Sequence, residues 1–220
     1  HPVLPAGARM GDMTATPPAP RRVCIVLFEG FELLDVFGPA ELFGLVPQVS
    51  VEYVGPQPGP VTSSHGAQVV ADLAYADLAQ PGILLVPGGQ GTRRLVHDQE
   101  FLTWLRHVAG TAQILASVCT GSALLAAAGL LEGHQATSNK RAFTWAAGFG
   151  THVDWKAQSR WVQDRNRWTS SGVAAGMDMT AALITELHGE AVAEAATRRA
   201  EYEPHTDSSR DPFAARHGLS

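Results

Sequence analysis

The sequence predicts an α/β domain with a mostly parallel central sheet that helices cover on both faces. Short apolar runs rich in β-branched residues alternate along most of the chain with segments of helical periodicity. Apolar residues form 45% of the 220 residues and charged residues 17%, a balance that suits one well-buried core. No linker and no internal repeat divides the chain, so we expect a single domain over residues 21–205.

The first half of the chain supplies the strands that open the predicted sheet. We expect strands in the apolar or alternating stretches 21–28, 49–55 and 67–73. A further buried strand begins at Gly82 and ends in the glycine-rich turn "PGGQG". A helix is expected from about Pro39, because proline is tolerated in the first turn of a helix.

The second half continues the alternation. Residues 98–110 have helical periodicity and end in glycine, residues 112–118 form an apolar strand, and a helix follows Cys119 to about Leu131. The tight turn "DRN" predicts a hairpin within residues 159–170. The remaining expected elements are a short strand at 135–139, a helix at 140–150, a strand at 152–156, and helices at 174–189 and 190–203.

The two ends of the chain are expected to lie outside this domain. Residues 1–20 lack the charged start and apolar stretch of a signal peptide, and we interpret them as a tag remnant or a disordered N-terminus. Residues 206–220 form a C-terminal tail that we expect to be ordered only in part.

Charge and cysteine content exclude several classes of function. A net charge of −5 with scattered basic residues offers no patch for nucleic acid or an anionic membrane. No apolar run approaches the roughly 18 residues that a membrane helix needs. The two cysteines and nine histidines follow no zinc, disulfide or HExxH spacing. We therefore expect no metal, no cofactor and a reducing compartment, most simply the cytoplasm.

Cys119 is the candidate nucleophile, because it lies at the corner where a buried strand turns into a helix. Gly121 and Ser122 are small, as such an elbow requires. A helix N-terminus stabilises a thiolate, and its N–H groups could also hold an anion that develops on a substrate. The alternative is a small core cysteine, which is the interpretation we give to Cys24, inside a strand.

Two further loops are expected at the same edge of the sheet, where the carboxyl ends of the strands form the functional crevice. "PGGQG" matches neither a P-loop nor GxGxxG, so its N–H groups, from Gly88 and Gly89, are expected to complete an anion hole. Asp35 is the acidic group that we place nearest the thiol, although such a residue is often only a helix cap. His65 is a loop histidine that could approach the crevice or lie exposed.

The segments "LLDVFGPAELF", "LLVPGGQGTRRL" and "ILASVCTGSALLAAAGLLEGHQATSN" follow one another as in the ThiJ/PfpI superfamily of class I glutamine amidotransferase-like proteins. So do "RWVQDRNRWTSSGVAAGMDMTAALI" and "EYEPHTDSSRDPF", and the resemblance covers about residues 22–213. Within this superfamily, the chain is most similar to the branch that contains isonitrile hydratases and the ligand-sensing domains of AraC-type regulators. It implies a flavodoxin-like three-layer sandwich, a homodimer and a small-molecule substrate.

The resemblance also implies roles for individual residues. It places the elbow cysteine, with strained backbone, at Cys119, the hydratases' acidic residue at Asp35 and their threonine at Thr120. The protease-like branch reads "CHG" at the elbow, so the "CTG" of this chain disfavours a peptidase. Asn139 stands where many AraC-type relatives carry a histidine, so we expect a Cys-Asp pair rather than a triad. A complete regulator would need a DNA-binding module beyond Ser220, and we expect none.

The predicted function is hydration of an isocyanide to an N-substituted formamide. Cys119 would attack the isocyanide carbon, Asp35 would donate a proton or activate water, and Thr120 would orient the thiol or the water. The first alternative is a non-enzymatic small-molecule or redox sensor, in which a low-pKa Cys119 oxidises readily. Amidase or glyoxalase chemistry is a third possibility, but it needs a histidine or a further acid that the sequence does not locate.

Overall fold

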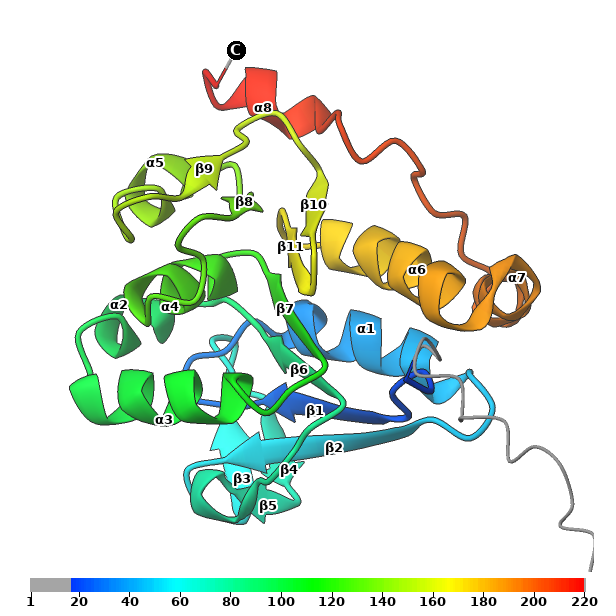
Figure 1. Ribbon diagram of the computed structural model, residues 1–220, viewed down its shortest axis with the longest axis horizontal. Coiled ribbons are helices and arrows are strands. Elements are labelled where there is room, and N and C mark those ends of the chain that lie inside the picture. The colour runs from blue at the N-terminus through cyan, green and yellow to red at the C-terminus, as the bar shows by residue number, and fades with distance from the viewer. Residues whose placement is uncertain (1–16, 220) are drawn as a thin grey trace, which may run out of the picture.

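The computed structural model describes residues 17–219, and the central feature is a seven-stranded sheet (Figure 1). Its strand order is β10-β11-β7-β6-β1-β2-β5, and every neighbouring pair is parallel except β10 and β11. The strands are β1 (Arg22–Val26), β2 (Ser50–Gly55), β5 (Leu73–Ala74), β6 (Ile83–Val86), β7 (Ile114–Val118), β10 (Trp161–Asp164) and β11 (Arg167–Ser170). The predicted α/β fold with a mostly parallel sheet is confirmed.

The order of the parallel strands is that of a flavodoxin-like sheet. From β1 the chain passes to β2 on one side and then returns to β6 on the other. The carboxyl ends of β1 and β6 therefore flank the point where the strand order reverses, and that is where such sheets bind ligands. The loop after β7 lies next to them, because β7 pairs with β6.

Helices cover both faces of the sheet (Figure 1). One layer consists of α1 (Leu33–Gly44), α6 (Ala175–His188) and α7 (Glu190–Arg199). The other consists of α2 (Thr92–Leu95), α3 (Gln99–Ala109) and α4 (Gly121–Ala127). The small elements are β3 (Gly59–Thr62), β4 (Gln68–Ala71), η1 (Tyr75–Asp77), β8 (Gln135–Ala136), α5 (Phe143–Ala146), β9 (Asp154–Trp155) and α8 (Pro212–Arg216).

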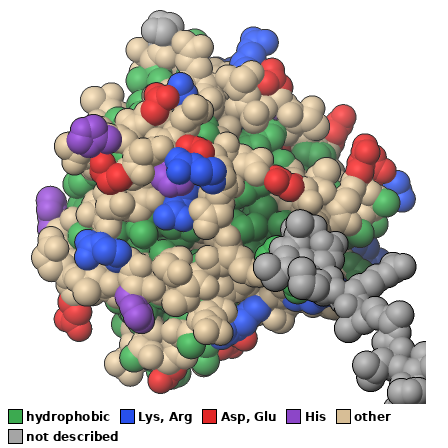
Figure 2. Space-filling model, viewed as in Figure 1, with side chains coloured by type: hydrophobic (Ala, Val, Ile, Leu, Met, Phe, Trp, Pro, Cys, Tyr) green, Lys and Arg blue, Asp and Glu red, His purple; other side chains and the backbone are tan. Residues whose placement is uncertain are grey.

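The core lies between these layers, because the central strands are buried on both faces. Every residue of β6 and β7 is buried, which explains why these strands are continuous apolar runs without alternation. α3 instead buries one side, where Phe101, Leu102 and Leu105 face the sheet. The space-filling view shows charged side chains of both signs scattered over one face (Figure 2).

Several predicted helix boundaries were wrong, and two of them belong to helices that carry the site. The first helix begins at Leu33 rather than near Pro39, which lies inside it. Burial of Val36, Leu42 and Phe43 compensates for the hydrogen bond that the proline nitrogen cannot donate. α4 ends at Ala127 rather than near Leu131, because the chain turns at Gly129 with a φ of +78°.

The C-terminal segment packs on the domain, and it contains the helix α8, which sequence reasoning did not predict. The N–H of Asp211 donates to the carbonyl of Gln158, and the N–H of Arg160 donates to the carbonyl of Ser208. The expectation for the N-terminus falls, for residues 1–16, outside the described part of the chain. Among residues 17–219 no helix is long and apolar enough to cross a membrane.

Candidate active site

Cys119 lies at a sharp corner between β7 and α4. Its φ is +58°, a left-handed conformation that strains a residue with a side chain. Hydrogen bonds on both sides of the peptide hold this conformation. The N–H of Cys119 donates to the carbonyl of Ser170 over 3.1 Å. Its carbonyl accepts from the hydroxyls of Ser122, at 3.2 Å, and Ser138, at 3.0 Å.

Small residues let three loops meet around the elbow. A Cβ added to Gly121 would lie 2.2 Å from the carbonyl oxygen of Val86, and one added to Gly88 would lie 2.5 Å from the nitrogen of Thr120. A Cβ on Gly172 would lie 2.8 Å from the sulfur of Cys119. The glycines at 88 and 121 are thus needed for close approach of the β6 and β7 loops.

Asp35 lies beneath the thiol, in the first turn of α1, and its side chain is wholly buried. Its Oδ2 accepts a hydrogen bond of 2.9 Å from the N–H of Gly88. Its Oδ1 is buried with no N–H or O–H donor among residues 17–219. The Cys119 thiol lies next to this carboxyl and hydrogen-bonds to it.

Burial raises both pKa values of this pair. The pKa of Asp35 rises to about 8, because desolvation outweighs the hydrogen bond from Gly88. The pKa of Cys119 rises well above its usual value, first through burial and then through the negative charge of Asp35. The prediction that Cys119 has a lowered pKa was therefore wrong. The Thr120 N–H and the Asn139 side chain hydrogen-bond the sulfur and offset only part of the shift.

The glycine-rich loop lies where the sequence places it, but its N–H groups have partners inside the protein. The N–H of Gly88 donates to Asp35, and that of Gly89 donates to Thr120 Oγ1 at 3.1 Å. The hydroxyl of Thr92 lies 3.1 Å from the same Thr120 oxygen. The N–H groups of Gly88 and Gly89, which were expected to form an anion hole, are therefore already hydrogen-bonded within the protein. The Thr120 N–H is the backbone donor that faces the sulfur.

Asn139 takes the place beside the sulfur that a histidine would have in a triad. Its Oδ1 accepts a 2.8 Å hydrogen bond from the N–H of Ala142, which fixes the orientation of the side-chain amide. The Nδ2 then faces the thiol as a donor. His65 does not approach Cys119. Its ring is exposed, and its Nε2 lies 3.2 Å from Oε1 of Glu32.

A cavity of about 320 Å³ opens above Cys119. Three charged side chains line it, namely those of Glu32, Arg93 and Arg141, together with polar groups from Gln90, Thr120 and Asn139. Sequence reasoning did not identify Glu32 or either arginine as a residue of the site. No local signal marks the arginines, because they belong to segments far apart in the sequence.

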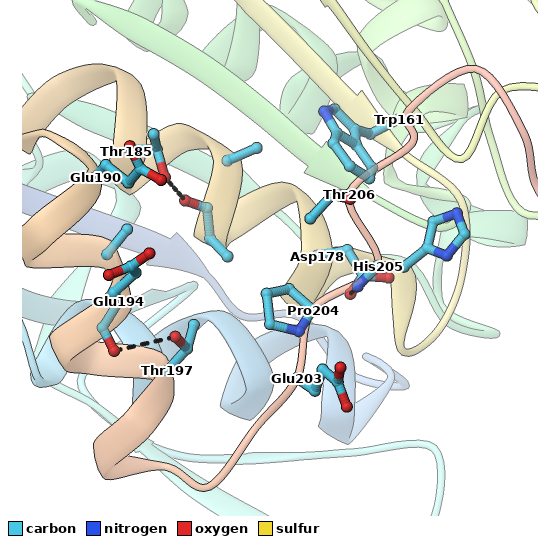
Figure 3. A pocket seen from close by; sticks show the side chains of 13 residues that line it. Trp161, Asp178, Thr185, Glu190, Glu194, Thr197, Glu203, Pro204, His205 and Thr206 are labelled. Atoms are coloured by element: carbon cyan, nitrogen blue, oxygen red, sulfur yellow. Dashed lines mark hydrogen bonds between the residues drawn. The ribbon is translucent and has the colours of Figure 1, made fainter.

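A larger cavity, of about 570 Å³, lies elsewhere in the molecule (Figure 3). It is bounded by α6, α7 and the segment 203–206, and no cysteine lines it. Asp178, at its wall, is already bound by Arg160, with 2.6 Å between Oδ2 and Nε. Of these two cavities, the smaller is the one that Cys119 lines, with Asp35 buried beside its thiol.

Residues 21–186 match the DJ-1/PfpI family. The chain belongs to this family. A ThiJ/PfpI family protein from Pseudomonas syringae is similar in structure, with 30% identity, a TM-score of 0.78, and coverage of all of this chain and 91% of that one. DJ-1β of Drosophila melanogaster shares the fold, with a TM-score of 0.73 at 19% identity over 82% of this chain and 97% of that one.

Curated members of the DJ-1/PfpI family include enzymes and regulators similar to this chain. The isonitrile hydratase of Pseudomonas putida is 34% identical over 183 residues, 83% of this chain and 79% of the hydratase. The HTH-type transcriptional regulator GbdR of Pseudomonas aeruginosa is 30% identical over 193 residues, 84% of this chain. The match spans only 51% of that regulator.

Proposed function

We propose that this member of the DJ-1/PfpI family hydrates an isocyanide to an N-substituted formamide. The observation that carries the proposal is a thiol that lines a small cavity and lies beside a wholly buried carboxyl, which has no cation near it among residues 17–219. Such a pair keeps its protons at neutral pH, and isocyanide hydration needs a nucleophile and a proton at one carbon. Similarity to a curated isonitrile hydratase over most of both chains supports the same reaction.

In the proposed reaction, Asp35 gives its proton to the terminal carbon of the isocyanide. The sulfur of Cys119 then bonds to that carbon, and its proton returns to Asp35, which leaves a thioimidate. Asp35 next gives this proton to the thioimidate nitrogen and, as a carboxylate, takes a proton from the water that adds to the carbon. The carbon–sulfur bond then breaks, the sulfur takes the proton from Asp35, and the hydroxyl proton of the adduct passes to Asp35 as the carbonyl forms. The products are the formamide and the free thiol, so the atoms of the isocyanide and of one water are all accounted for.

Neighbouring groups have positioning roles in this proposal. The Thr120 N–H and the Asn139 amide face the sulfur and stabilise negative charge on it during attack and release. The Thr120 hydroxyl binds the N–H of Gly89 and so ties the β6 loop to the elbow. Gly88 holds Asp35, and Gly121 allows the elbow to approach β6.

The test is formamide production from a simple alkyl isocyanide by wild type, Cys119→Ala and Asp35→Asn. We expect turnover by wild type alone, and kcat/KM should fall as pH rises through about 8, where Asp35 loses its proton. Full activity of either variant would contradict the mechanism. Lack of turnover by wild type would favour the second candidate.

That second candidate is a small-molecule sensor, which the similarity to GbdR favours. A sensor would bind a ligand at the same cavity without converting it. The raised pKa of Cys119 weakens the redox form of this idea, because the thiolate is the species that peroxide oxidises. Treatment with low peroxide should then leave Cys119 unmodified by mass spectrometry.

We also propose that the chain works as a homodimer in the cytoplasm. α1 exposes two large apolar side chains, Leu34 and Phe37, on either side of the buried Asp35. A twofold contact through this helix would cover both. Light scattering of wild type should give twice the mass of one chain, and Phe37→Glu should give the mass of one.

A further inference from the structure

Two arginines face the cavity above Cys119 without a charged partner. Arg93 belongs to α2 and Arg141 to the loop before α5, and both line the cavity that contains the sulfur. Neither forms an ion pair within the described part of the chain. Two guanidinium groups that line one small cavity and form no ion pair there can bind an anionic group together.

The position of Arg93 is held by an aromatic ring. The carbon at the centre of its guanidinium lies 3.8 Å from the centroid of Trp145. Stacking of this kind fixes the plane of the group and leaves its N–H edges available for a planar anion. This preorganisation lowers the entropy lost when an anion binds.

Neither acidic residue of the site, Glu32 or Asp35, forms an ion pair with the two arginines. Glu32 lines the same cavity, but its Oε2 accepts from the Ser64 hydroxyl at 3.3 Å and its Oε1 lies 3.2 Å from His65. Both partners belong to the turn between β3 and β4. Asp35 lies beside the thiol outside the cavity lining, and burial raises its pKa, which opposes a negative charge there. Lys140 points elsewhere, with Nζ donating to Thr137 and to the Ser138 carbonyl.

We propose that the substrate is a small isocyanide that carries a carboxylate, held by Arg93 and Arg141 while Cys119 attacks its other end. The inference rests on the proposed hydration for the reacting group, and it adds the substrate class. A cavity of about 320 Å³ suits a molecule of this size, and a carboxylate matches the forked donors of arginine.

The first test compares isocyanoacetate with its ethyl ester, which has the same reacting group and no charge. We expect wild type to prefer the acid in kcat/KM. The acid-to-ester ratio should fall about tenfold in Arg93→Gln and in Arg141→Gln, the loss of one charge-assisted contact. Arg94→Gln is the matched control, because Arg94 lines a different cavity, and the ratio should stay at its wild-type value.

A second test does not depend on hydratase activity. Iodoacetate and iodoacetamide alkylate a thiol by the same displacement of iodide, and only iodoacetate carries a carboxylate. We expect the rate ratio of iodoacetate to iodoacetamide at Cys119, measured by peptide mass spectrometry, to fall in Arg93→Gln and Arg141→Gln but not in Arg94→Gln. An unchanged ratio, or no modification by either reagent, would overturn the arginine site.

The two tests separate the two ideas. If wild type hydrates neither compound but the alkylation ratio depends on the arginines, the hydratase proposal fails and the anion site stands. If wild type hydrates both compounds equally and the variants keep that ratio, hydration stands and the anion site fails.

Discussion

At the scale of single residues, the site depends on a carboxyl group that the fold keeps out of water. Within the described residues 17–219, Asp35 has no cation beside it and accepts one backbone hydrogen bond, so its ionised form is poorly compensated. The neighbouring thiol is in the same situation, and a negative charge on either group opposes a charge on the other. The resting pair therefore holds both protons, ready for a reaction that needs one of them on carbon.

The raised pKa of Asp35 predicts a stability effect with a definite sign. In the unfolded chain Asp35 ionises near 3.8, and in the folded chain near 8. Wild type therefore loses stability as pH rises between those values, whereas Asp35→Asn has no proton to lose and still accepts from Gly88. We expect the variant to be more stable at pH 7, by at most about 4 kcal/mol. Urea unfolding at pH 7 and pH 4 should show this gain shrinking at the lower pH, and an equal gain at both would contradict it.

Gly172 predicts an effect on activity without a large effect on folding. A methyl group there would lie 2.4 Å from Nδ2 of Asn139 and 2.8 Å from the sulfur, so both groups must move. Gly172→Ala should lower kcat/KM for the isocyanide on the order of a hundredfold. Gly44→Ala is the control, because nothing lies within 4 Å of the added Cβ, and its kcat/KM should match wild type.

At the scale of elements, the helices α1, α2 and α4 that carry the site begin without a side-chain cap, and their buried faces support them. α1 contains Pro39 and still forms, because its buried face is large enough. α4 has only seven residues and is wholly packed against the sheet up to Ala126. α3 is amphipathic and begins with a capping aspartate, so it is the element whose sequence and structure agree most closely.

The cap of α3 predicts a measurable loss of stability. Asp98 accepts a hydrogen bond of 3.1 Å from the N–H of Phe101, one of the first N–H groups of the helix. Asp98→Ala should lower the free energy of unfolding by about 1 kcal/mol, while Asp98→Asn keeps the acceptor and should lose much less. Urea denaturation of the two variants distinguishes them, and equal losses would show that the cap is not the cause.

At the scale of the whole molecule, one buried ion network attaches the C-terminal segment to the domain. Arg160, from the loop before β10, binds Asp178 of α6 at 2.6 Å and lies 3.6 Å from Asp211 at the start of α8. Tyr202 and the N–H of His205 also bind Asp178. The segment after α7 is thus part of the folded unit and closes the larger cavity (Figure 3).

Removal of the cation from this network should be costly. Arg160→Gln leaves the buried Asp178 without its cation and removes the guanidinium 3.6 Å from Asp211, and we expect a loss of about 3 kcal/mol in the free energy of unfolding. Arg165→Gln removes an exposed pair with Asp164, and its unfolding midpoint should stay close to that of wild type. A similar midpoint for both variants would contradict the structural role of Arg160.

The sequence by itself determined the fold class, the hairpin of β10 and β11, and the elbow at Cys119. These features depend on local patterns, such as runs of β-branched residues, a tight polar turn, and small residues after a buried strand. The sequence also placed Asp35 and Gly88 at the same edge of the sheet as Cys119, because the carboxyl ends of parallel strands lie at one edge. The resemblance added Asn139 as the residue beside the sulfur.

Only the tertiary structure decided the chemistry of that edge. No local sequence pattern reports the degree of burial. Burial raises the pKa of both Cys119 and Asp35, so the pair favours its protonated form instead of the expected thiolate. The N–H groups of Gly88 and Gly89 donate to Asp35 and Thr120, which lie far from them in the sequence. Packing of separate loops brought Arg93 and Arg141 to one cavity. Each outcome depends on atoms far apart in the chain, because desolvation, pairing and proximity are properties of the folded state.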